Sequence, residues 1–303
     1  MAVALVGATA SGKSDLAHQL ALESDGAIEI LCVDSMTVYR GMDIGTAKAT
    51  AAQREQVTYH LLDLIEPHEE FTVSQFQHEA RESAELVWAL GGSVLYVGGT
   101  GLYGRAVIDN LDIPGQFPDV RADLEERGDD LPGLYEELTR HDPLAASRME
   151  PTNRRRIVRA LEVTLGAGRP FSSFGSGLRH YGAPRVVQVG LNCEFGVLDV
   201  RIARRFESWM EQGLLEEVAH LREQGMSRTA RQAVGYRELL RHLEEGADLD
   251  QCVEDAITQS RRLARRQRSW FQRDPRVEWF DDPSDAAKRL DEILRSPDGF
   301  VRD

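Results

Sequence analysis

The stretch G-A-T-A-S-G-K-S at residues 7–14 restricts the fold of this chain more than any other feature. An apolar run at residues 2–6 leads into it, and residues 14–23 follow with apolar side chains at helical spacing. A glycine-rich turn between a strand and a helix forms a phosphate-binding loop, because its backbone N–H groups and the positive end of the helix dipole face one anion. A glycine turn that arose by chance is the alternative, and the flanking strand and helix argue against it.

The loop predicts a phosphate site made of backbone groups and two side chains. Its predicted members are Gly7, Thr9, Ala10, Ser11, Gly12, Lys13 and Ser14. In the pattern G-x-x-x-x-G-K-S, Lys13 reaches the terminal phosphate and the Ser14 hydroxyl is placed to hold Mg²⁺. Only three of the 36 basic residues are lysines, so the lysine kept at position 13 indicates a need for a compact ammonium group. The pattern is specific for phosphate and not for ATP.

Further apolar runs predict buried strands at residues 27–33, 93–97 and 186–191, and an amphipathic helix is expected at 73–90. Strands that alternate with helices predict a parallel sheet, whose ligands bind beyond the carboxyl ends of the strands. The phosphate-binding loop, Asp34 and Thr100 each follow such an end. We therefore expect them to share one crevice.

The predicted fold class is α/β, with a P-loop NTPase-like parallel sheet core and a helical insertion domain. Between residues 111 and 184, short helical segments are broken by prolines and no strand pattern is evident. We therefore predict a core domain formed by residues 1–110 and 185–303, and an insertion domain at 111–184. Residues 200–271 of the core are expected to be mostly helical.

Composition excludes several classes of protein. The net charge of −14 argues against a protein that coats nucleic acid through its overall field. Cys32, Cys193 and Cys252 lie far apart, so neither a disulfide framework nor a cysteine zinc site is expected. No apolar stretch is long enough to span a bilayer, and residues 2–6 do not form a signal peptide. We expect no membrane partner and a cytoplasmic location.

Two arginine clusters depart from the acidic average. Residues 259–276 hold seven arginines against one acid, Asp274, which gives a formal local charge of +6. The second cluster consists of Arg154, Arg155, Arg156 and Arg159. A polyanion can dock at such clusters, and the aromatic Trp270 and Phe271 favour nucleic acid over a merely solvated helix face.

Asp34 is the first candidate for chemistry outside the loop. An aspartate at the end of an apolar strand can be a metal ligand in phosphate-binding-loop proteins. Asp34, however, lies only about twenty residues beyond the loop, and the polar Ser35, Tyr39, Arg40 and Asp43 follow it. This region is more polar and irregular than a metal-binding strand end requires. The position of Asp34 alone does not decide whether it binds a metal or takes part in the chemistry directly.

Longer motifs carry a resemblance to a known family. They are D-S-M-T-V-Y-R-G-M-D-I-G-T-A-K (34–48), V-G-G-T-G-L-Y (97–103), R-R-R-I-V-R-A-L-E-V (154–163), R-I-A-R-R-F (201–206), Q-A-V-G-Y-R-E (232–238) and R-R-L-A-R-R-Q-R-S-W-F (261–271). Together with the loop at 7–14 they resemble, in family order, the tRNA dimethylallyltransferases, also called isopentenyl-diphosphate:tRNA transferases. The resemblance covers almost the whole chain.

The resemblance implies transfer of a dimethylallyl group from dimethylallyl diphosphate to N6 of adenine 37 in tRNA, with Mg²⁺. The phosphate-binding loop then holds a leaving diphosphate, and no phosphoryl group moves. Asp34 matches the family's catalytic base, Lys13 and Thr100 complete the catalytic set, and Arg205 matches an arginine that binds the diphosphate. A surface ion pair is the alternative for Arg205. The adenine must leave its stack to reach these groups.

The resemblance also implies contacts to a tRNA anticodon stem-loop with adenines at positions 36, 37 and 38, and we expect the protein to act as a monomer. The implied tRNA-contacting residues are Asp34, Ser35, Met36, Thr37, Thr100, Arg121, Arg155, Arg156, Arg159, Gln232, Gly235, Tyr236, Arg237, Arg265, Arg266, Gln267, Arg268 and Trp270. The chain departs from the family pattern at Ala8, often proline, at Thr37, often glutamine, and at Gln272, often arginine. It lacks the zinc-finger motif that some eukaryotic relatives carry.

Three other functions remain as alternatives. A P-loop small-molecule kinase would share the phosphate-binding loop, but no second metal carboxylate or lid arginine pattern is evident. An adenylate isopentenyltransferase would use free AMP or ATP as acceptor, but the arginine clusters and the insertion favour tRNA. A non-catalytic RNA-binding module would not need the combination of Lys13, Ser14, Asp34 and Thr100.

Overall fold

The computed structural model describes residues 1–295 except 129, 176 and 179. The chain divides into two compact units. One consists of Met1–Asp109 together with the chain from Ala183 onward, and the other is Asn110–Gly182. The sequence placed this insertion at residues 111–184.

The first unit is built on a six-stranded parallel sheet with the strand order β3-β2-β4-β1-β5-β6. Its strands are β1 Ala2–Gly7, β2 Ile28–Val33, β3 Tyr59–His60, β4 Ser93–Gly98, β5 Val187–Leu191 and β6 Val277–Phe280. The α/β class and the parallel core predicted from the alternating apolar runs are confirmed. The sequence did not predict the short edge strands β3 and β6.

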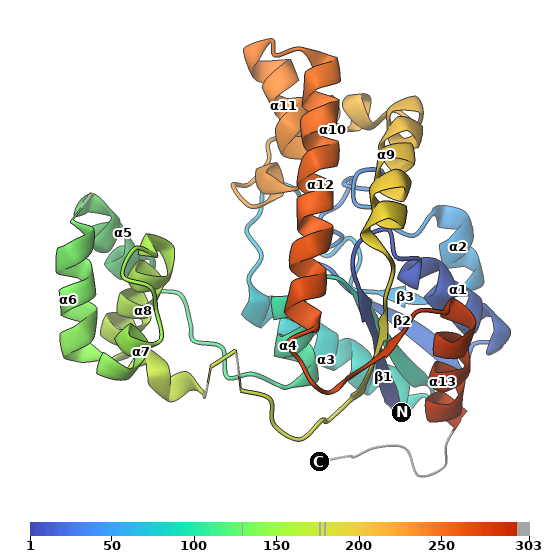
Figure 1. The fold of residues 1–303 in the computed structure, drawn as a ribbon, viewed down its shortest axis with the longest axis horizontal. Helices are drawn as coiled ribbons and strands as arrows, with labels where there is room; N and C mark the ends of the chain where they lie inside the picture. The colour runs from blue at the N-terminus through green and yellow to red at the C-terminus, as the bar shows by residue number, and fades with distance from the viewer. Residues whose placement is uncertain (129, 176, 179, 296–303) are drawn as a thin grey trace. The chain divides into compact units, whose positions relative to one another are not determined.

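Helices cover both faces of this sheet (Figure 1). They are α1 Lys13–Glu23, α2 Ala51–Gln56, α3 Val73–Ala89, α4 Gly101–Ile108, α9 Phe195–Glu211, α10 Leu214–Gln224, α11 Tyr236–Glu245, α12 Leu249–Phe271 and α13 Pro283–Arg295, with a 3₁₀ turn, η2, at Ala230–Gln232. Successive residues of β1 point to opposite faces, so Val3 and Leu5 pack with α1 and α13. Ala4 and Val6 belong to the larger core formed with α3, α4 and α9 to α12.

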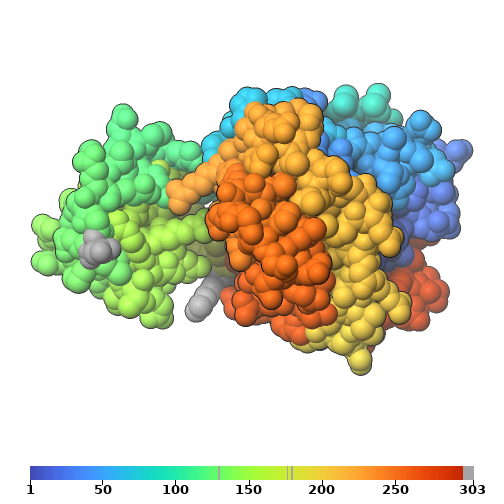
Figure 2. All heavy atoms as spheres, turned by 90° about the horizontal axis from the view of Figure 1, so that it is seen from above, coloured from blue at the N-terminus to red at the C-terminus, as the bar shows by residue number. Residues whose placement is uncertain are grey.

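Figure 2 shows α11 and α12, in orange, beside α9, in yellow, on one surface of this unit. Helices α11 and α12 carry four of the eight arginines predicted to contact tRNA, which are Arg237, Arg265, Arg266 and Arg268. Among the described residues no helix is long and apolar enough to cross a membrane.

The second unit is helical, as its broken pattern predicts. It contains α5 Pro118–Glu126, α6 Leu131–His141, α7 Pro143–Ser147, α8 Arg154–Ala167 and a 3₁₀ turn, η1, at Phe171–Phe174. Several of the prolines begin helices instead of only breaking them: Pro118, Pro132 and Pro143 occupy first-turn positions, where no backbone hydrogen bond is lost. Leu134, Leu138, Ile157 and Leu161 form its own buried core.

The register of the sheet brings three strand ends together. Val6 of β1 and Val33 of β2 both lie opposite Gly98 of β4. Gly98 has no room for a side chain, because an added Cβ would lie within 2.0 Å of the Val33 carbonyl oxygen. The loops that follow β1, β2 and β4 therefore start at one level of one sheet edge.

Candidate active site

The phosphate-binding loop connects β1 to α1, and its backbone shape depends on glycine. Gly12, at the start of α1, has a φ of 95°, which glycine adopts without steric cost. A Cβ on Gly7 would lie 3.0 Å from the Leu191 carbonyl oxygen. Lys13 bends back over the loop, where its Nζ donates to the Ala8 carbonyl at 3.2 Å. The loop between a strand and a helix is therefore present as expected, and its binding of a phosphate stays a prediction.

Two arginines of α9, one helical turn apart, reach the same loop. Arg205 Nη1 donates to the Thr9 hydroxyl at 3.3 Å, so it lies at the loop, and its part in binding a diphosphate stays a prediction. Arg201 Nη1 donates to the carbonyls of Ala10, at 3.2 Å, and Ser11, at 3.4 Å. Sequence reasoning missed Arg201, although it begins the same R-I-A-R-R-F motif and lies four residues before Arg205.

Burial and nearby charges alter the pKa of Lys13. Burial lowers the pKa of Lys13 from 10.5 to about 8, the negative charge of Asp34 opposes this shift, and Arg205 adds to it. Bringing a lysine and two arginines to one loop is unfavourable without a bound anion. The cluster therefore fits a ligand with several negative charges, such as a diphosphate.

Asp34 follows β2 and lies beside Thr100, which follows β4. The Asp34 Oδ1 accepts the Met36 N–H at 2.8 Å, and its Oδ2 accepts the Thr100 hydroxyl at 3.4 Å. Thr100 Oγ1 in turn accepts the Ser35 N–H at 3.4 Å. Burial raises the pKa of Asp34, while the Met36 amide, the charge of Lys13 and the Thr100 hydroxyl oppose the shift. A half-buried carboxylate with raised proton affinity is suited to act as a general base.

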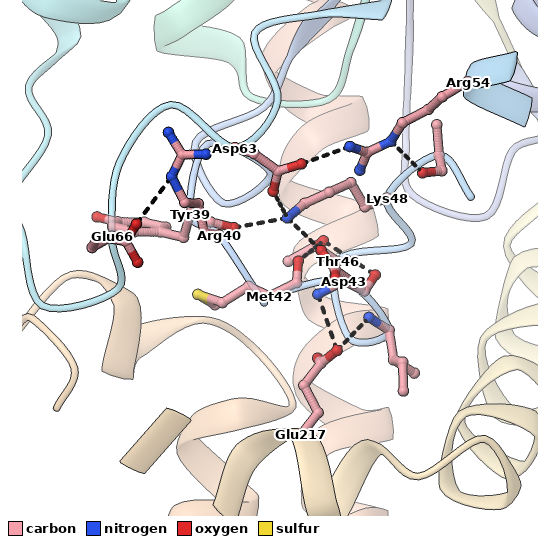
Figure 3. A network of polar contacts seen from close by, with 12 residues as sticks. Tyr39, Arg40, Met42, Asp43, Thr46, Lys48, Arg54, Asp63, Glu66 and Glu217 are labelled. Carbon is pink, nitrogen blue, oxygen red and sulfur yellow. Dashed lines mark hydrogen bonds and ion pairs between the residues drawn. The ribbon is translucent and has the colours of Figure 1, made fainter. Parts of the chain in front are cut away.

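The loop at 34–48 ends on a buried ionic cluster around Lys48 (Figure 3). Lys48 Nζ donates to the Tyr39 carbonyl at 2.7 Å, to Asp43 at 2.6 Å and to Asp63 at 2.7 Å. Its side chain is only 1% exposed. The Asp63 backbone N–H also donates to the Thr37 carbonyl at 3.2 Å, so the cluster is tied to the chain just beyond Asp34.

Glu217 of α10 fixes the far end of the same loop (Figure 3). Its carboxylate accepts the backbone N–H groups of residues 43, 44 and 45 at 3.1, 2.8 and 3.3 Å. It also accepts the Tyr236 hydroxyl at 2.5 Å. Sequence reasoning missed both Lys48 and Glu217 as anchors. The available signal was that Lys48 is one of few lysines in an arginine-rich chain.

Tyr236 requires a correction. It was predicted to contact tRNA, but its side chain is 0% exposed and packs in the main core. A Cβ on Gly45 would lie 2.5 Å from the Tyr236 ring, so the ring fills the space under the 34–48 loop. The Tyr236 side chain supports this loop and is not available to a nucleic acid.

Other predicted contacts of this segment and of the 34–48 loop are placed as follows. Gln232 ends η2, and Gly235 adopts a φ of 95° before α11. Arg237 is paired with the buried Glu238. Ser35 and Met36 are half-buried next to Asp34, and Thr37 is 7% exposed with no hydrogen-bond partner for its hydroxyl within the described part of the chain.

The predicted contacts on α12 divide between two faces of the helix. Arg265 donates to Asp199 at 2.8 Å, and Arg265 and Arg268 lie over the Phe195 ring. Arg266 is exposed. Gln267 points the other way and accepts the Thr9 N–H at 2.7 Å. Trp270 is half-buried against Gly101.

In the second unit, the predicted contacts Arg155 and Arg156 are exposed in the first turn of α8. Arg159 donates to Glu162 at 2.7 Å, and Arg121 donates to the same carboxylate at 3.4 Å. Glu162 is 1% exposed at its side chain, so this pairing helps to hold the unit together. Among the described residues, Arg155 and Arg156 have no carboxylate partner, and Arg154 donates to the backbone carbonyls of Gly128 and Glu125.

The oxygen donors near the loop fit a magnesium ion held mainly by a substrate. Ser14 is exposed in the first turn of α1. Within residues 1–295, leaving aside the three undescribed positions, no group of three or more His, Cys, Asp or Glu side chains could hold a metal. Mg²⁺ commonly binds through one or two protein oxygens, waters and substrate phosphates. Ser14 together with a diphosphate would supply such a set.

Known proteins resemble this chain along most of its length. The family model described as IPP transferase matches residues 37–274. A tRNA dimethylallyltransferase of Kocuria rhizophila is 45% identical over 290 residues, which cover 93% of this chain and 90% of that relative. Another, from Kineococcus radiotolerans, is 45% identical over 305 residues and 96% of each chain.

Solved structures show the same similarity. The full-length tRNA isopentenylpyrophosphate transferase of Bacillus halodurans aligns with a TM-score of 0.68 and 35% identity, over 95% of this chain and 93% of that one. A eukaryotic dimethylallyltransferase acting on tRNA aligns with a TM-score of 0.78 and 25% identity, over 96% of this chain and 78% of that one.

Proposed function

The chain belongs to the IPP transferase family and is a prenyltransferase that modifies tRNA; we propose that its donor is dimethylallyl diphosphate and its acceptor is N6 of adenine 37. The main support from the molecule itself is the position of the Asp34 carboxylate. It lies close enough to Lys13 of the phosphate-binding loop for each charge to shift the pKa of the other. An anion cradle after β1 and a base after β2, at the same sheet edge with β4 between them, match a transfer that releases a diphosphate and removes a proton.

In this proposal the cradle stabilises the leaving group. When the allylic C–O bond breaks, its electron pair goes to the diphosphate, which gains negative charge. Lys13 and Arg205 lie at the loop that would hold this group, and the backbone N–H groups of the loop add partial positive charge. Ser14 would hold Mg²⁺ with the diphosphate oxygens, and that ion would neutralise further charge.

Asp34 serves as the base on the acceptor side. The N6 lone pair forms the new C–N bond to the dimethylallyl carbon, and one N6 proton passes to the Asp34 carboxylate. The Met36 N–H and the Thr100 hydroxyl fix the orientation of this carboxylate. The raised pKa of Asp34 favours its acceptance of the proton.

An adenine that reacts at N6 has to leave the stacked anticodon loop, as enzymes that modify bases require. We propose that exposed arginines, among them Arg155, Arg156 and Arg266, bind the phosphates of the stem-loop. We further propose that the chain works as a monomer in the cytoplasm, where tRNA is modified.

Incubation with Mg²⁺, labelled dimethylallyl diphosphate and an anticodon stem-loop with adenines at 36, 37 and 38 tests the proposal. We expect label in the RNA, and none when position 37 is guanine. Label in free AMP but not in the stem-loop would overturn the tRNA acceptor. Formation of ADP from ATP and a small acceptor would support a kinase instead.

A further inference from the structure

On the inward face of α12, Gln267 lies in a stripe of otherwise small or apolar residues. Ser260, Ala264 and Phe271 are buried, with exposed fractions of 8%, 1% and 5%. Gln267 lies three residues after Ala264 and four before Phe271, which puts it on the same side of the helix. The neighbouring Arg266 is exposed, so the two adjacent side chains face different surroundings.

Gln267 meets the start of the phosphate-binding loop. Its Oε1 accepts the Thr9 N–H at 2.7 Å, a contact that joins residues far apart in the sequence. On its other side lies Gly99, between β4 and Thr100. A Cβ on Gly99 would lie 2.6 Å from Gln267 Nε2, so a larger residue at position 99 would push the carboxamide from its present place.

This contact completes the support of Thr9. The Thr9 hydroxyl accepts from Arg205, and its backbone N–H donates to Gln267. A carboxamide satisfies this N–H without placing a negative charge beside the anion site, whereas a carboxylate at the same place would repel a diphosphate. The residue type therefore fits a position at the edge of an anion cradle.

We propose that Gln267 is a positioning residue of the diphosphate site, which holds Thr9 against the Gly99–Thr100 segment, and that it does not read tRNA. This inference rests on the proposed use of the loop for a diphosphate. It divides the predicted contacts of α12 in two: Arg266 faces the RNA, and Gln267 faces the donor. One helix then carries both functions on different faces.

Two measurements on the full chain separate these roles: the affinity for pyrophosphate in Mg²⁺ buffer, by calorimetry, and the affinity for the anticodon stem-loop. For Gln267→Met, which keeps the side-chain volume but removes the acceptor, we expect pyrophosphate affinity and the KM for the donor to worsen by about three- to tenfold. RNA affinity should stay unchanged. Gln267→Glu should weaken pyrophosphate binding further, by about tenfold or more, through charge repulsion.

Arg266→Ala is the matched control from the next position of the same helix. It should weaken RNA binding and leave pyrophosphate affinity unchanged. If Gln267→Met binds pyrophosphate like the unmodified chain, or loses affinity only for RNA, the inference is wrong. If the unmodified chain itself does not bind pyrophosphate, the proposed function fails instead, so the two failures are distinguishable. Circular dichroism of each variant checks that the fold is kept.

Discussion

The charge of Lys13 should set the upper pH limit of donor use. Its pKa in the free chain is about 8, lowered mainly by burial, against 10.5 for an ordinary lysine. The ammonium form attracts a diphosphate, so affinity is greatest below this pKa and falls as the pH rises through it. At a pH one unit above the pKa, about one molecule in ten keeps the charge, so kcat/KM for the donor should fall about tenfold per pH unit.

Three proteins isolate this effect: the unmodified chain, Lys13→Arg and Lys13→Met. The arginine variant stays charged at every accessible pH, so its kcat/KM should not show the alkaline fall, although its planar group fits a point-charge position less well. The methionine variant should lose about 10²- to 10³-fold in kcat, because one stabilising group of the leaving diphosphate is gone. The donor ionises in the same way in all three assays, so its ionisation cannot cause a difference between the pH profiles of the three proteins.

The assay is the initial rate of label transfer to the stem-loop with limiting donor, between about pH 6 and about pH 9.5. The pH dependence of kcat/KM reports the pKa values of groups in the free protein, and the Lys13 pKa of about 8 is a value for the free protein. A flat profile of the unmodified chain above pH 7 would refute the reasoning. So would an alkaline fall that persists unchanged in Lys13→Met.

Three further results are expected. Asp34→Asn cannot take up the proton, so single-turnover kcat should fall by about 10²- to 10⁴-fold, while pyrophosphate and RNA binding remain; an active variant would remove Asp34 from the base role. Lys48→Met removes the buried cation that Asp43, Asp63 and the Tyr39 carbonyl share, and leaves Asp63 with Arg54 alone, so urea unfolding should show a loss of about 2–4 kcal/mol, against about 0–1 kcal/mol for the exposed Arg40→Ala. RNA affinity should fall steeply with salt, and Arg156→Ala should reduce that logarithmic slope by about 1; an unchanged slope would argue against a phosphate contact.

Local patterns predicted the parts of the fold that depend on neighbouring residues. The glycine spacing at 7–14 and the apolar runs gave the loop and four strands, since each is specified by a few consecutive side chains. The edge strand β3 has only two residues, Tyr59–His60, which is too short to show a period. Two anchors of the 34–48 loop join segments that are distant in the sequence: Asp63 holds Lys48, and Glu217 holds residues 43–45. Such contacts produce no local pattern in the sequence.

Side-chain direction was the weaker part of the site prediction. A family motif gives a run of positions, but a helix turns its residues to different sides. Tyr236 and Gln267 both lie in motifs implied to contact tRNA, yet one is in the core and the other at the phosphate-binding loop. Spacing could have separated Gln267 from Arg266, because Ala264, Gln267 and Phe271 follow a helical period. The partners of Tyr236 could be found only in three dimensions.

The strand order explains why a phosphate-binding loop can serve a carbon–nitrogen transfer here. β4 lies between β1 and β2, so the loop after β1 and Asp34 after β2 are separated by two strand spacings, about 10 Å. Thr100 follows the strand between them and bonds Asp34. A direct phosphoryl transfer would need the acceptor next to the phosphate, whereas a prenyl transfer needs room for a five-carbon group between the diphosphate and the base. The shared register of Val6 and Val33 opposite Gly98 fixes the ends of β1 and β2 on either side of β4, an arrangement that suits such an interval between the loop and the base.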